Sequence, residues 1–227
     1  MDGLRTYLRD HHRSLHMVIM TGDLTQRARK KEFLLARDFL ITLELPVYVI
    51  PGNHDIPLYH LAERFFRPYY RFNKYLSPWS PTFYEDEKVL ICGLRTTNKF
   101  TVKKELIHQH ELIQIETRLA QAGDKIKIIA SHHPLTSENL SEDLQRILKA
   151  NPRLLLWGHE HQSKVIHFPG FPDTIAVAGG TSISSRIRTE QNSFNEIIFS
   201  ESELSVKTLH LEGNQFITDG KFSSLIF

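Results

Sequence analysis

The sequence predicts an α/β fold in which strands and helices alternate along most of the chain. Three observations predict it: short apolar runs with the length of buried strands, amphipathic stretches between them, and polar breaks directly after several strands. A chain of 227 residues can bury a full core. Because no stretch reads as a linker or a repeat, we expect one domain spanning residues 1–227.

The first part of the chain forms a strand–helix–strand unit. The predicted elements are a helix over 4–15, a strand over 16–20, a helix over 26–43 and a strand over 46–50. Parallel strands joined by a right-handed helical crossover end at the same edge of a sheet. Asp23 and Asn53, which follow the two strands, are therefore expected side by side.

The rest of the chain continues the alternation and then becomes β only. A helix is expected over 58–66, followed by an irregular cap near the site. The later predicted elements are a hairpin over 82–94, a helix over 104–121, a strand over 125–130, a helix over 142–148, a strand over 153–157, and strands over 164–167, 174–177, 194–199 and 204–211.

Composition excludes several classes of protein. The formal net charge is only +2, which gives no reason to expect a nucleic-acid or membrane partner. No apolar run approaches the roughly 18 residues of a membrane span. Cys92 is the single cysteine, so no internal disulfide and no cysteine-based zinc site can form. This cysteine usage fits a reducing compartment, and we expect a cytoplasmic protein.

Four strands end in side chains that can bind a metal: Asp23, Asn53, His132, and the pair His159 and His161. Loops at the carboxyl ends of parallel strands gather side chains into one crevice. Oxygen and imidazole ligands without sulfur suit Mn, Fe, Zn or Co. In the stretch after the second strand, His54 can bind a metal, donate a proton or hold a phosphate oxygen. Asp55 can orient that imidazole.

These stretches resemble a known family. Four segments resemble four of the five signature blocks of the calcineurin-like metallophosphoesterases, in matching order and spacing: residues 22–25, 52–55, 131–134 and 158–161. The first two blocks resemble in particular the bacterial branch that contains cyclic-nucleotide phosphodiesterases. The resemblance implies a four-layer αββα sandwich with two mixed sheets face to face, and two metal ions held a few ångströms apart.

The resemblance also implies a role for each matching residue. Asp23 would bridge the two metals, Asn53, His132 and His159 would complete the second site, and His161 would belong to the first. His54 would assist the leaving group, with Asp55 positioning it. His132 matches the family ligand, and His133 has the weaker claim. The implied reaction is hydrolysis of a small phosphoric ester by a metal-activated hydroxide that attacks in line.

The family's first block, Asp-x-His at the end of a first strand, has no match ahead of Gly22. The pattern Asp-x-His does occur at residues 10–12. That segment follows a polar helix, however, and leaves no room for a helical crossover before Gly22. The first metal would then keep only Asp23 and His161 from this chain, too few for a stable site. We therefore expect an N-terminally truncated domain that lacks the first strand, retains one metal and has reduced activity.

Two alternatives remain open. The chain could be a metal-binding remnant or scaffold of the same fold without turnover, which the absent first block favours. It could also be a nuclease of the same superfamily, although the sequence shows no basic stripe for nucleic acid. The sequence does not select between a cyclic nucleotide, a lipid head group and another phosphodiester.

Overall fold

The computed structural model describes residues 2–100, 106–135, 142–168, 170–183, 191–200 and 202–226. The helices are α1 (Asp2–His11), α2 (Lys30–Ile41), α3 (Leu61–Phe66), α4 (Tyr70–Leu76), α5 (Gln109–Ala120) and α6 (Glu142–Lys149), with 3₁₀ turns at Asn53–Asp55 and Ser77–Trp79. The strands are β1 (Val18–Met20), β2 (Val47–Val49), β3 (Phe83–Glu85), β4 (Val89–Leu94), β5 (Ile126–Ser131), β6 (Leu154–Trp157), β7 (Lys164–Phe168), β8 (Phe171–Ala178), β9 (Ser193–Phe199), β10 (Glu203–Glu212) and β11 (Gln215–Ile226).

The largest sheet has six strands in the order β3-β4-β5-β6-β8-β7. Its four inner strands, β4, β5, β6 and β8, run parallel, and the edge strands β3 and β7 are antiparallel to their neighbours. The inner strands are almost wholly buried, as expected for parallel strands covered on both faces. All four therefore end at one edge of a rigid sheet.

Two smaller sheets lie on one face of the large sheet. One is the parallel pair β1-β2, and the other is the antiparallel sheet β9-β10-β11. Tyr48 of β2 and Val206 of β10 pack with Ile91 and Ile128 of the large sheet. Val49, the next residue after Tyr48, points the other way and packs in the outer core with α2 and α4.

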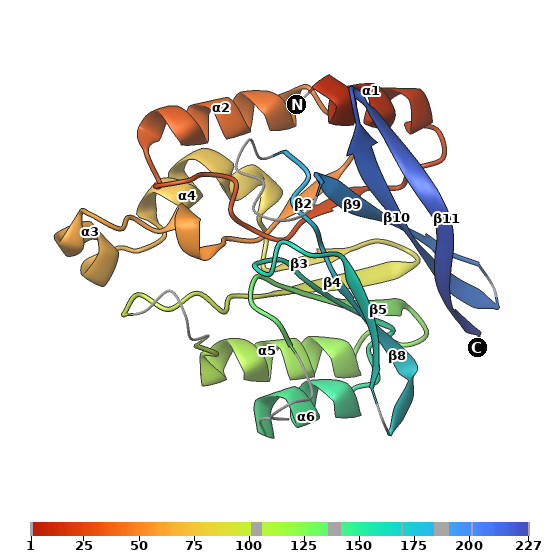
Figure 1. Cartoon of the computed structure of the whole chain (residues 1–227). Coiled ribbons are helices and arrows are strands. Elements are labelled where there is room, and N and C mark those ends of the chain that lie inside the picture. Colours follow the sequence, from red (N-terminus) through yellow and green to blue (C-terminus); the bar gives the residue numbers. More distant parts are fainter. Residues whose placement is uncertain are drawn as a thin grey trace.

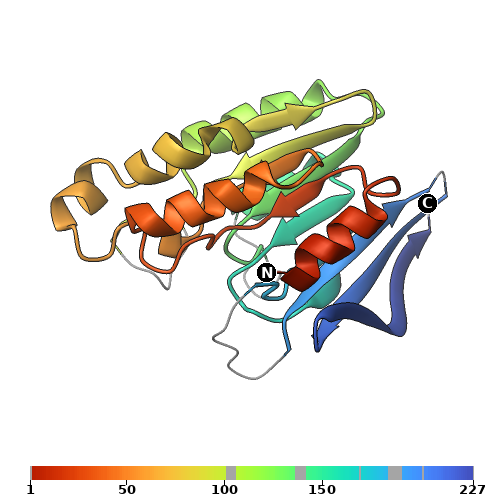
Figure 2. The same cartoon turned by 90° about the horizontal axis from the view of Figure 1, so that it is seen from above.

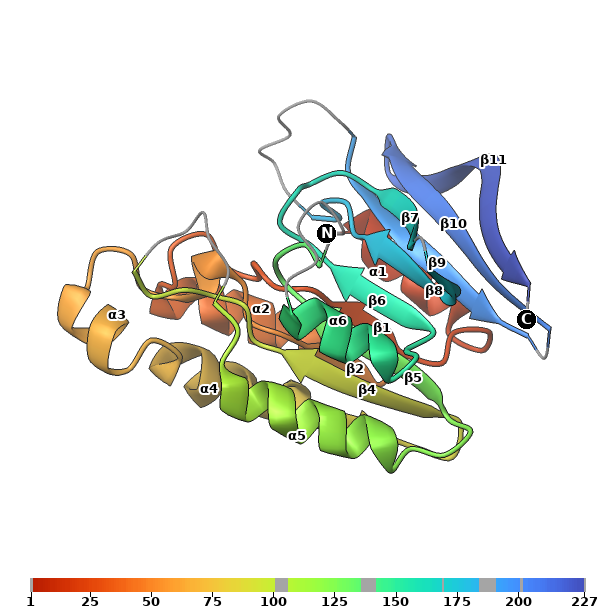
Figure 3. The same ribbon diagram turned by 90° about the horizontal axis from the view of Figure 1, so that it is seen from below.

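Helices cover the outside of both strand layers (Figure 1). Seen from above, α1, α2 and α4 lie over the smaller sheets (Figure 2). Seen from below, α5 and α6 lie against the six-stranded sheet (Figure 3), where Leu112, Ile115 and Ile147 enter the core. The order helix, strand, strand, helix confirms the predicted four-layer α/β architecture. The prediction of an N-terminal truncation stays a prediction.

Three details of the predicted elements differ. The segment after residue 66 was expected to be irregular, yet it forms α4, whose Phe72 and Leu76 are buried against the outer core. Helix α2 begins at Lys30 and not near 26, because residues 21–29 are used in the loop after β1. Strand β11 was not predicted, although Gly213 and Asn214 form the turn that starts it, and Gly213 has the positive φ of 58° that such turns need.

Part of the predicted helix over 104–121 lies outside the described residues, and the described helix begins at Gln109. Among the residues that the structure describes, no helix is long and apolar enough to cross a membrane.

Candidate metal centre

The candidate centre lies where strands of two sheets end. Asp23 and Asn53 follow β1 and β2, and His132 and His159 follow β5 and β6. The backbone N–H of Gly158 donates to the carbonyl oxygen of His132 over 3.1 Å, which joins the last two loops. The predicted gathering of these strand ends is thus present in the fold.

Four side-chain atoms of these residues converge on one point. The oxygen Oδ1 of Asn53 lies 2.9 Å from Nε2 of His132 and 3.0 Å from Nδ1 of His159. The two imidazole nitrogens are 3.2 Å apart, and Oδ1 of Asp23 is 3.4 Å from Nε2 of His132. These are the four residues expected to form one metal site.

The hydrogen bonds around His132 show what this set of atoms can bind. Its Nδ1 lies 2.8 Å from the carbonyl oxygen of Thr21, which can only accept, so Nδ1 carries the proton. In the neutral ring, Nε2 then presents a lone pair to two oxygens, Oδ1 of Asn53 and Oδ1 of Asp23. Lone pairs that face one another repel unless a cation lies between them. The residues therefore fit a metal ion.

Burial supports the same conclusion. Desolvation lowers the pKa of His132, although the nearby carboxylate of Asp23 works in the opposite direction. Burial also lowers the pKa of His159, again against Asp23. Both rings are therefore held in the neutral form, which is the form that binds metals.

His133 belongs to the same group of histidines. Ligand atoms of His132, His133 and His159 all lie within 4.8 Å of one another. His133 is buried, and its Nδ1 lies 3.0 Å from the hydroxyl of Thr96. The family resemblance favoured His132 over His133 as the ligand, since the family pattern selects His132. The structure places it beside the candidate ligands.

His161 is near this group but is turned elsewhere. Its Nδ1 lies 2.7 Å from the hydroxyl of Thr181, and the ring is exposed. Its charge contributes to lowering the pKa of His159, after the larger effect of burial, so the two rings are close. The structure thus brings together the four candidate ligands of one site and leaves His161 at its rim.

The backbone is unusual at three predicted ligands. Asp23, His159 and His161 have positive φ angles of 58°, 65° and 60°. Residues with side chains adopt this region rarely, and such conformations concentrate at functional sites. The loops after β1 and β6 therefore both contain left-handed backbone within a few residues of the strand end.

Two glycines let the loops after β1 and β2 touch. A Cβ atom on Gly22 would lie 2.7 Å from the backbone nitrogen of Gly52, and one on Gly52 would lie 2.1 Å from Oδ1 of Asp23. Glycine is needed here for close approach, and at Gly22, with φ of 97°, also for the backbone conformation. The close contact of the two loops thus explains why a glycine precedes both Asp23 and Asn53.

His54 sits next to the candidate metal site. Its backbone N–H donates to Oδ1 of Asp23 over 3.0 Å, and its Nδ1 lies 2.8 Å from the carbonyl oxygen of Gln26. That carbonyl fixes the proton on Nδ1 in the neutral ring and leaves Nε2 available for another partner. The side chain is exposed, as a group that meets a substrate must be.

Asp55 does not hold the ring of His54, contrary to the expectation from sequence. The ring uses the carbonyl of Gln26, while the fully buried carboxylate of Asp55 accepts from the backbone N–H groups of Gly52, Thr25 and Leu24. The Thr25 hydroxyl lies 3.0 Å from it. Burial and then the charge of Asp23 raise the pKa of the Asp55 carboxyl to about 7. Asp55 therefore ties the first two loops together.

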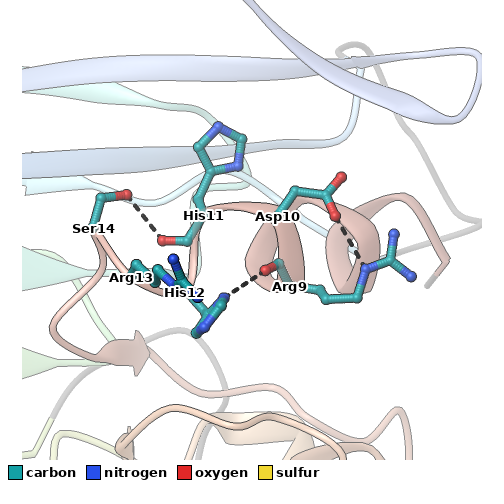
Figure 4. A pocket seen from close by; sticks show the side chains of 6 residues that line it. All are labelled: Arg9, Asp10, His11, His12, Arg13 and Ser14. Atoms are coloured by element: carbon teal, nitrogen blue, oxygen red, sulfur yellow. Dashed lines mark hydrogen bonds and ion pairs between the residues drawn. The ribbon is translucent and has the colours of Figure 1, made fainter.

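The pattern at Asp10 and His12 lies away from this centre. Figure 4 shows both residues lining a surface pocket at the end of α1, where Asp10 pairs with Arg9 and Nδ1 of His12 lies 2.9 Å from the Arg9 carbonyl oxygen. The chain enters β1 from that end of α1, whereas the candidate ligands follow the other end of β1. These residues therefore do not supply the family's first block.

Comparison with known proteins identifies the family. The family model of the calcineurin-like phosphoesterases matches residues 1–163. The chain belongs to this family.

Two curated relatives are named as phosphodiesterases. A probable glycerophosphodiester phosphodiesterase of Arcobacter nitrofigilis is 31% identical over 141 residues, which are 61% of this chain and 49% of that protein. The 3′,5′-cyclic adenosine monophosphate phosphodiesterase of Haemophilus influenzae is 22% identical over 176 residues, 72% of this chain and 61% of that protein. The chain thus spans about half to three fifths of the length of these relatives.

Solved structures with a similar course of the chain include Vps29 proteins. A Vps29 double mutant from Entamoeba histolytica has a TM-score of 0.48 at 16% identity, covering 98% of this chain and 88% of that one. Vacuolar protein sorting 29 from Cryptosporidium parvum has a TM-score of 0.48 at 14% identity, covering 98% of this chain and 89% of that one.

Proposed function

We propose that this chain is a metal-dependent hydrolase of small phosphoric diesters. The observation that carries the proposal is the convergence of Asp23, Asn53, His132 and His159, with an imidazole lone pair facing two oxygens. Two curated relatives named as phosphodiesterases support the choice of ester. The donor set suits Mn, Fe, Zn or Co, and the family uses two such ions.

A divalent ion in this centre would supply Lewis-acid activation of the phosphoryl group and of the attacking water. The residues of this chain bind the ion and orient its ligands. Asp23, Asn53, His132 and His159 hold the centre, and Thr21 fixes the tautomer of His132 through its carbonyl oxygen. Water adds its oxygen to phosphorus in line and gives up a proton to solvent, while the ester P–O bond breaks and the leaving oxygen takes up a proton.

His54 is the proposed proton donor to the leaving oxygen. Its Nδ1–H donates to the carbonyl oxygen of Gln26, so in the imidazolium form Nε2 carries the proton that can be delivered. Its backbone N–H to Asp23 keeps the ring next to the metal ligands. Asp55 is a positioning residue, because it braces the loops that carry Asp23 and His54 without touching the His54 ring.

A second candidate is a metal-binding protein of this fold without turnover. The orientation of His161 favours it, because that ring contacts Thr181 at the rim while the four ligands of one site are assembled. This candidate binds one ion per chain. We also propose a cytoplasmic location, which the single cysteine supports.

Metal content and turnover on the same sample test the proposal. After loading with Mn²⁺, we expect bound metal by elemental analysis and hydrolysis of bis(p-nitrophenyl) phosphate. Asn53→Ala and His132→Ala should lose metal and turnover together. His54→Ala should keep the metal and lose turnover of cyclic AMP, whose alkoxide leaving group needs a proton, about 100-fold, the usual range for removing a general acid. The loss on bis(p-nitrophenyl) phosphate should be smaller, because its leaving group departs without a proton. The exposed His108 outside the site, as His108→Ala, is the control.

Three outcomes are distinct. Metal binding with turnover supports the hydrolase. One ion per chain with no turnover, even in excess Mn²⁺, supports the metal-binding candidate. Protein that neither retains metal nor cleaves the diester overturns both.

A further inference from the structure

A cation on a tyrosine ring lies beside the proposed proton donor. The guanidinium carbon of Arg27 is 5.7 Å from the centre of the Tyr59 ring. Tyr59 is 67% exposed, and Arg27 is exposed as well. Within the described ranges, the Arg27 guanidinium has no carboxylate or hydrogen-bond partner, and it lies over the Tyr59 ring. The pair thus presents an unneutralised cation and an open aromatic face.

The backbone brings Arg27 close to His54, and Tyr59 lies beside Arg27. Gln26, the residue before Arg27, supplies the carbonyl oxygen that holds the His54 ring at 2.8 Å. The backbone N–H of Arg27 donates to Oε2 of Glu32 over 2.9 Å, which anchors this loop to the start of α2. Arg27 is therefore fixed one residue away from the contact that orients His54.

The segment from His54 to Tyr59 is anchored as well. Ile56 and Pro57 are buried, and the carbonyl oxygen of Pro57 accepts from Nη1 of Arg64 over 3.3 Å. Arg64 is itself 5% exposed and also donates to the carbonyl oxygen of Lys99 over 2.6 Å. Tyr59 therefore projects from a braced stretch of chain, and its ring needs little reorganisation to meet a ligand.

A planar guanidinium and a phenol ring stack well on other flat π-systems. Stacking of a base on an aromatic side chain is tolerant of base identity, and arginine adds a cation–π contribution. A glycerol group has no flat face to offer, and the Arg27 cation beside the ring disfavours a cationic group such as choline. The cation also favours an anionic substrate, which every phosphodiester is. The chemistry that fits the pair is thus a phosphodiester with a planar aromatic substituent.

We propose that Arg27 and Tyr59 form the surface that receives the aromatic ring of a nucleotide-type or aryl phosphodiester, and so determine specificity. The inference rests on the proposed hydrolase function. It assigns the ring-bearing side of the substrate to the same side of the centre as His54, where the leaving group departs.

Three substrates distinguish recognition of the aromatic ring from recognition of the phosphate. Cyclic AMP and bis(p-nitrophenyl) phosphate carry planar rings, and glycerophosphoglycerol carries neither a ring nor a cation. Tyr59→Ala should raise KM about 10-fold for the first two and leave KM for glycerophosphoglycerol unchanged, with kcat little affected. Tyr59→Phe keeps the ring and should restore the wild-type KM. Equal losses on all three substrates, or no loss on the aromatic ones, would overturn the inference.

Tyr70 is a matched control. It is 50% exposed, lies in α4, and has the ammonium of Lys74 at 5.9 Å from its ring centre. Tyr70 and Lys74 thus form a second cation–ring pair, on helix α4, which packs against α2. Tyr70→Ala should therefore leave KM for all three substrates unchanged.

Binding of AMP, followed by calorimetry on Mn²⁺-loaded protein, gives a readout without turnover. The dissociation constant should rise about 10-fold in Tyr59→Ala and not in Tyr70→Ala. If wild-type protein binds AMP through Tyr59 but cleaves none of the diesters, the hydrolase proposal fails and the ring site stands. If it cleaves diesters without dependence on Tyr59, or if AMP does not bind, the ring site fails.

Discussion

The carbonyl oxygen of Thr21 and Nδ1 of His132 lie 2.8 Å apart, although the two residues are 111 positions apart in the sequence. This contact joins the loop after β1 to the loop after β5, and therefore one of the smaller sheets to the six-stranded sheet. It also fixes which nitrogen of His132 faces Asn53 and Asp23. The metal-binding form of the ring thus depends on correct packing of two strand layers.

Gly22→Ala should disturb this contact. A Cβ on Gly22 would lie 2.6 Å from Nδ1 of His132, and the backbone there has a φ of 97°. Gly123, with a φ of 57° and no atom within 4 Å of a Cβ, has the backbone strain without the clash. Gly123→Ala should cost about 1 kcal/mol of unfolding free energy and leave metal affinity unchanged. Gly22→Ala should cost more and weaken Mn²⁺ binding about 10-fold or more. Equal metal affinities in the two variants would contradict the role of the contact.

Thr25→Val should loosen the joint between the first two loops. The Thr25 hydroxyl lies 3.0 Å from Oδ1 of Asp55 and 2.9 Å from the carbonyl oxygen of His54, and it accepts from the N–H of Ala28. Valine has a similar shape but leaves these buried groups with fewer partners, so we expect a loss of about 2 kcal/mol in urea unfolding. Thr25→Ser keeps the hydroxyl and should lose under half as much. A serine variant as unstable as the valine variant would point to packing as the cause.

Asp23→Asn should stabilise the metal-free protein while abolishing its response to metal. The charge of Asp23 is the second cause, after burial, that raises the pKa of Asp55. Removing that charge removes a like-charge repulsion, and asparagine tolerates the φ of 58° at this position. In EDTA we expect about 1 kcal/mol of added stability. Mn²⁺ should raise the Tm of the wild type and not of the variant. Asp38→Asn, which removes only the pair with Arg37 on α2, should respond to Mn²⁺ like the wild type.

Asp86 should contribute stability that is lost in acid. Burial acts to raise the pKa of its carboxyl, but His16 and the backbone N–H groups of Val89 and Lys88 lower it from 3.8 to about 2. A depressed carboxyl pKa stabilises the fold above the unfolded value, and the contribution disappears as pH falls through the folded value. Because the side chain is 26% exposed, solvent screening reduces the effect to about 1 kcal/mol. Urea unfolding of wild type and Asp86→Asn should differ by this amount at pH 6, and the difference should shrink as pH falls and vanish at about pH 1. A difference that does not shrink between pH 6 and pH 2 would contradict the assignment.

Much of this site could be predicted because strand ends leave a clear pattern in sequence. The apolar runs before Asp23, Asn53, His132 and His159 predict parallel strands, and parallel strands of a sheet end at one edge. Only the existence of these strands and their order are needed for that argument. The four residues do come together in the structure.

Other features depend on loop conformation, which spacing does not reveal. Asp55 is adjacent to His54 in sequence, yet the turn Asn53–Asp55 directs its carboxylate under the loop toward Gly52 and Thr25. His133 reaches the histidine group because Thr96, from the loop after β4, holds its ring. Helix α4 is short, and its apolar residues do not predict a helix until the outer core that buries them is known. In each case a distant partner decides the outcome.

The left-handed backbone at Asp23, His159 and His161 limits how this centre could be re-engineered for a different metal. A softer ion would call for thiolate ligands. Cysteine lacks the tolerance of this conformation that Asp, Asn and His show, so grafting it at those three positions adds a folding penalty of about 1 kcal/mol each. Asn53 and His132 have no such backbone restriction. Laboratory evolution toward sulfur ligation should therefore succeed first at these two positions.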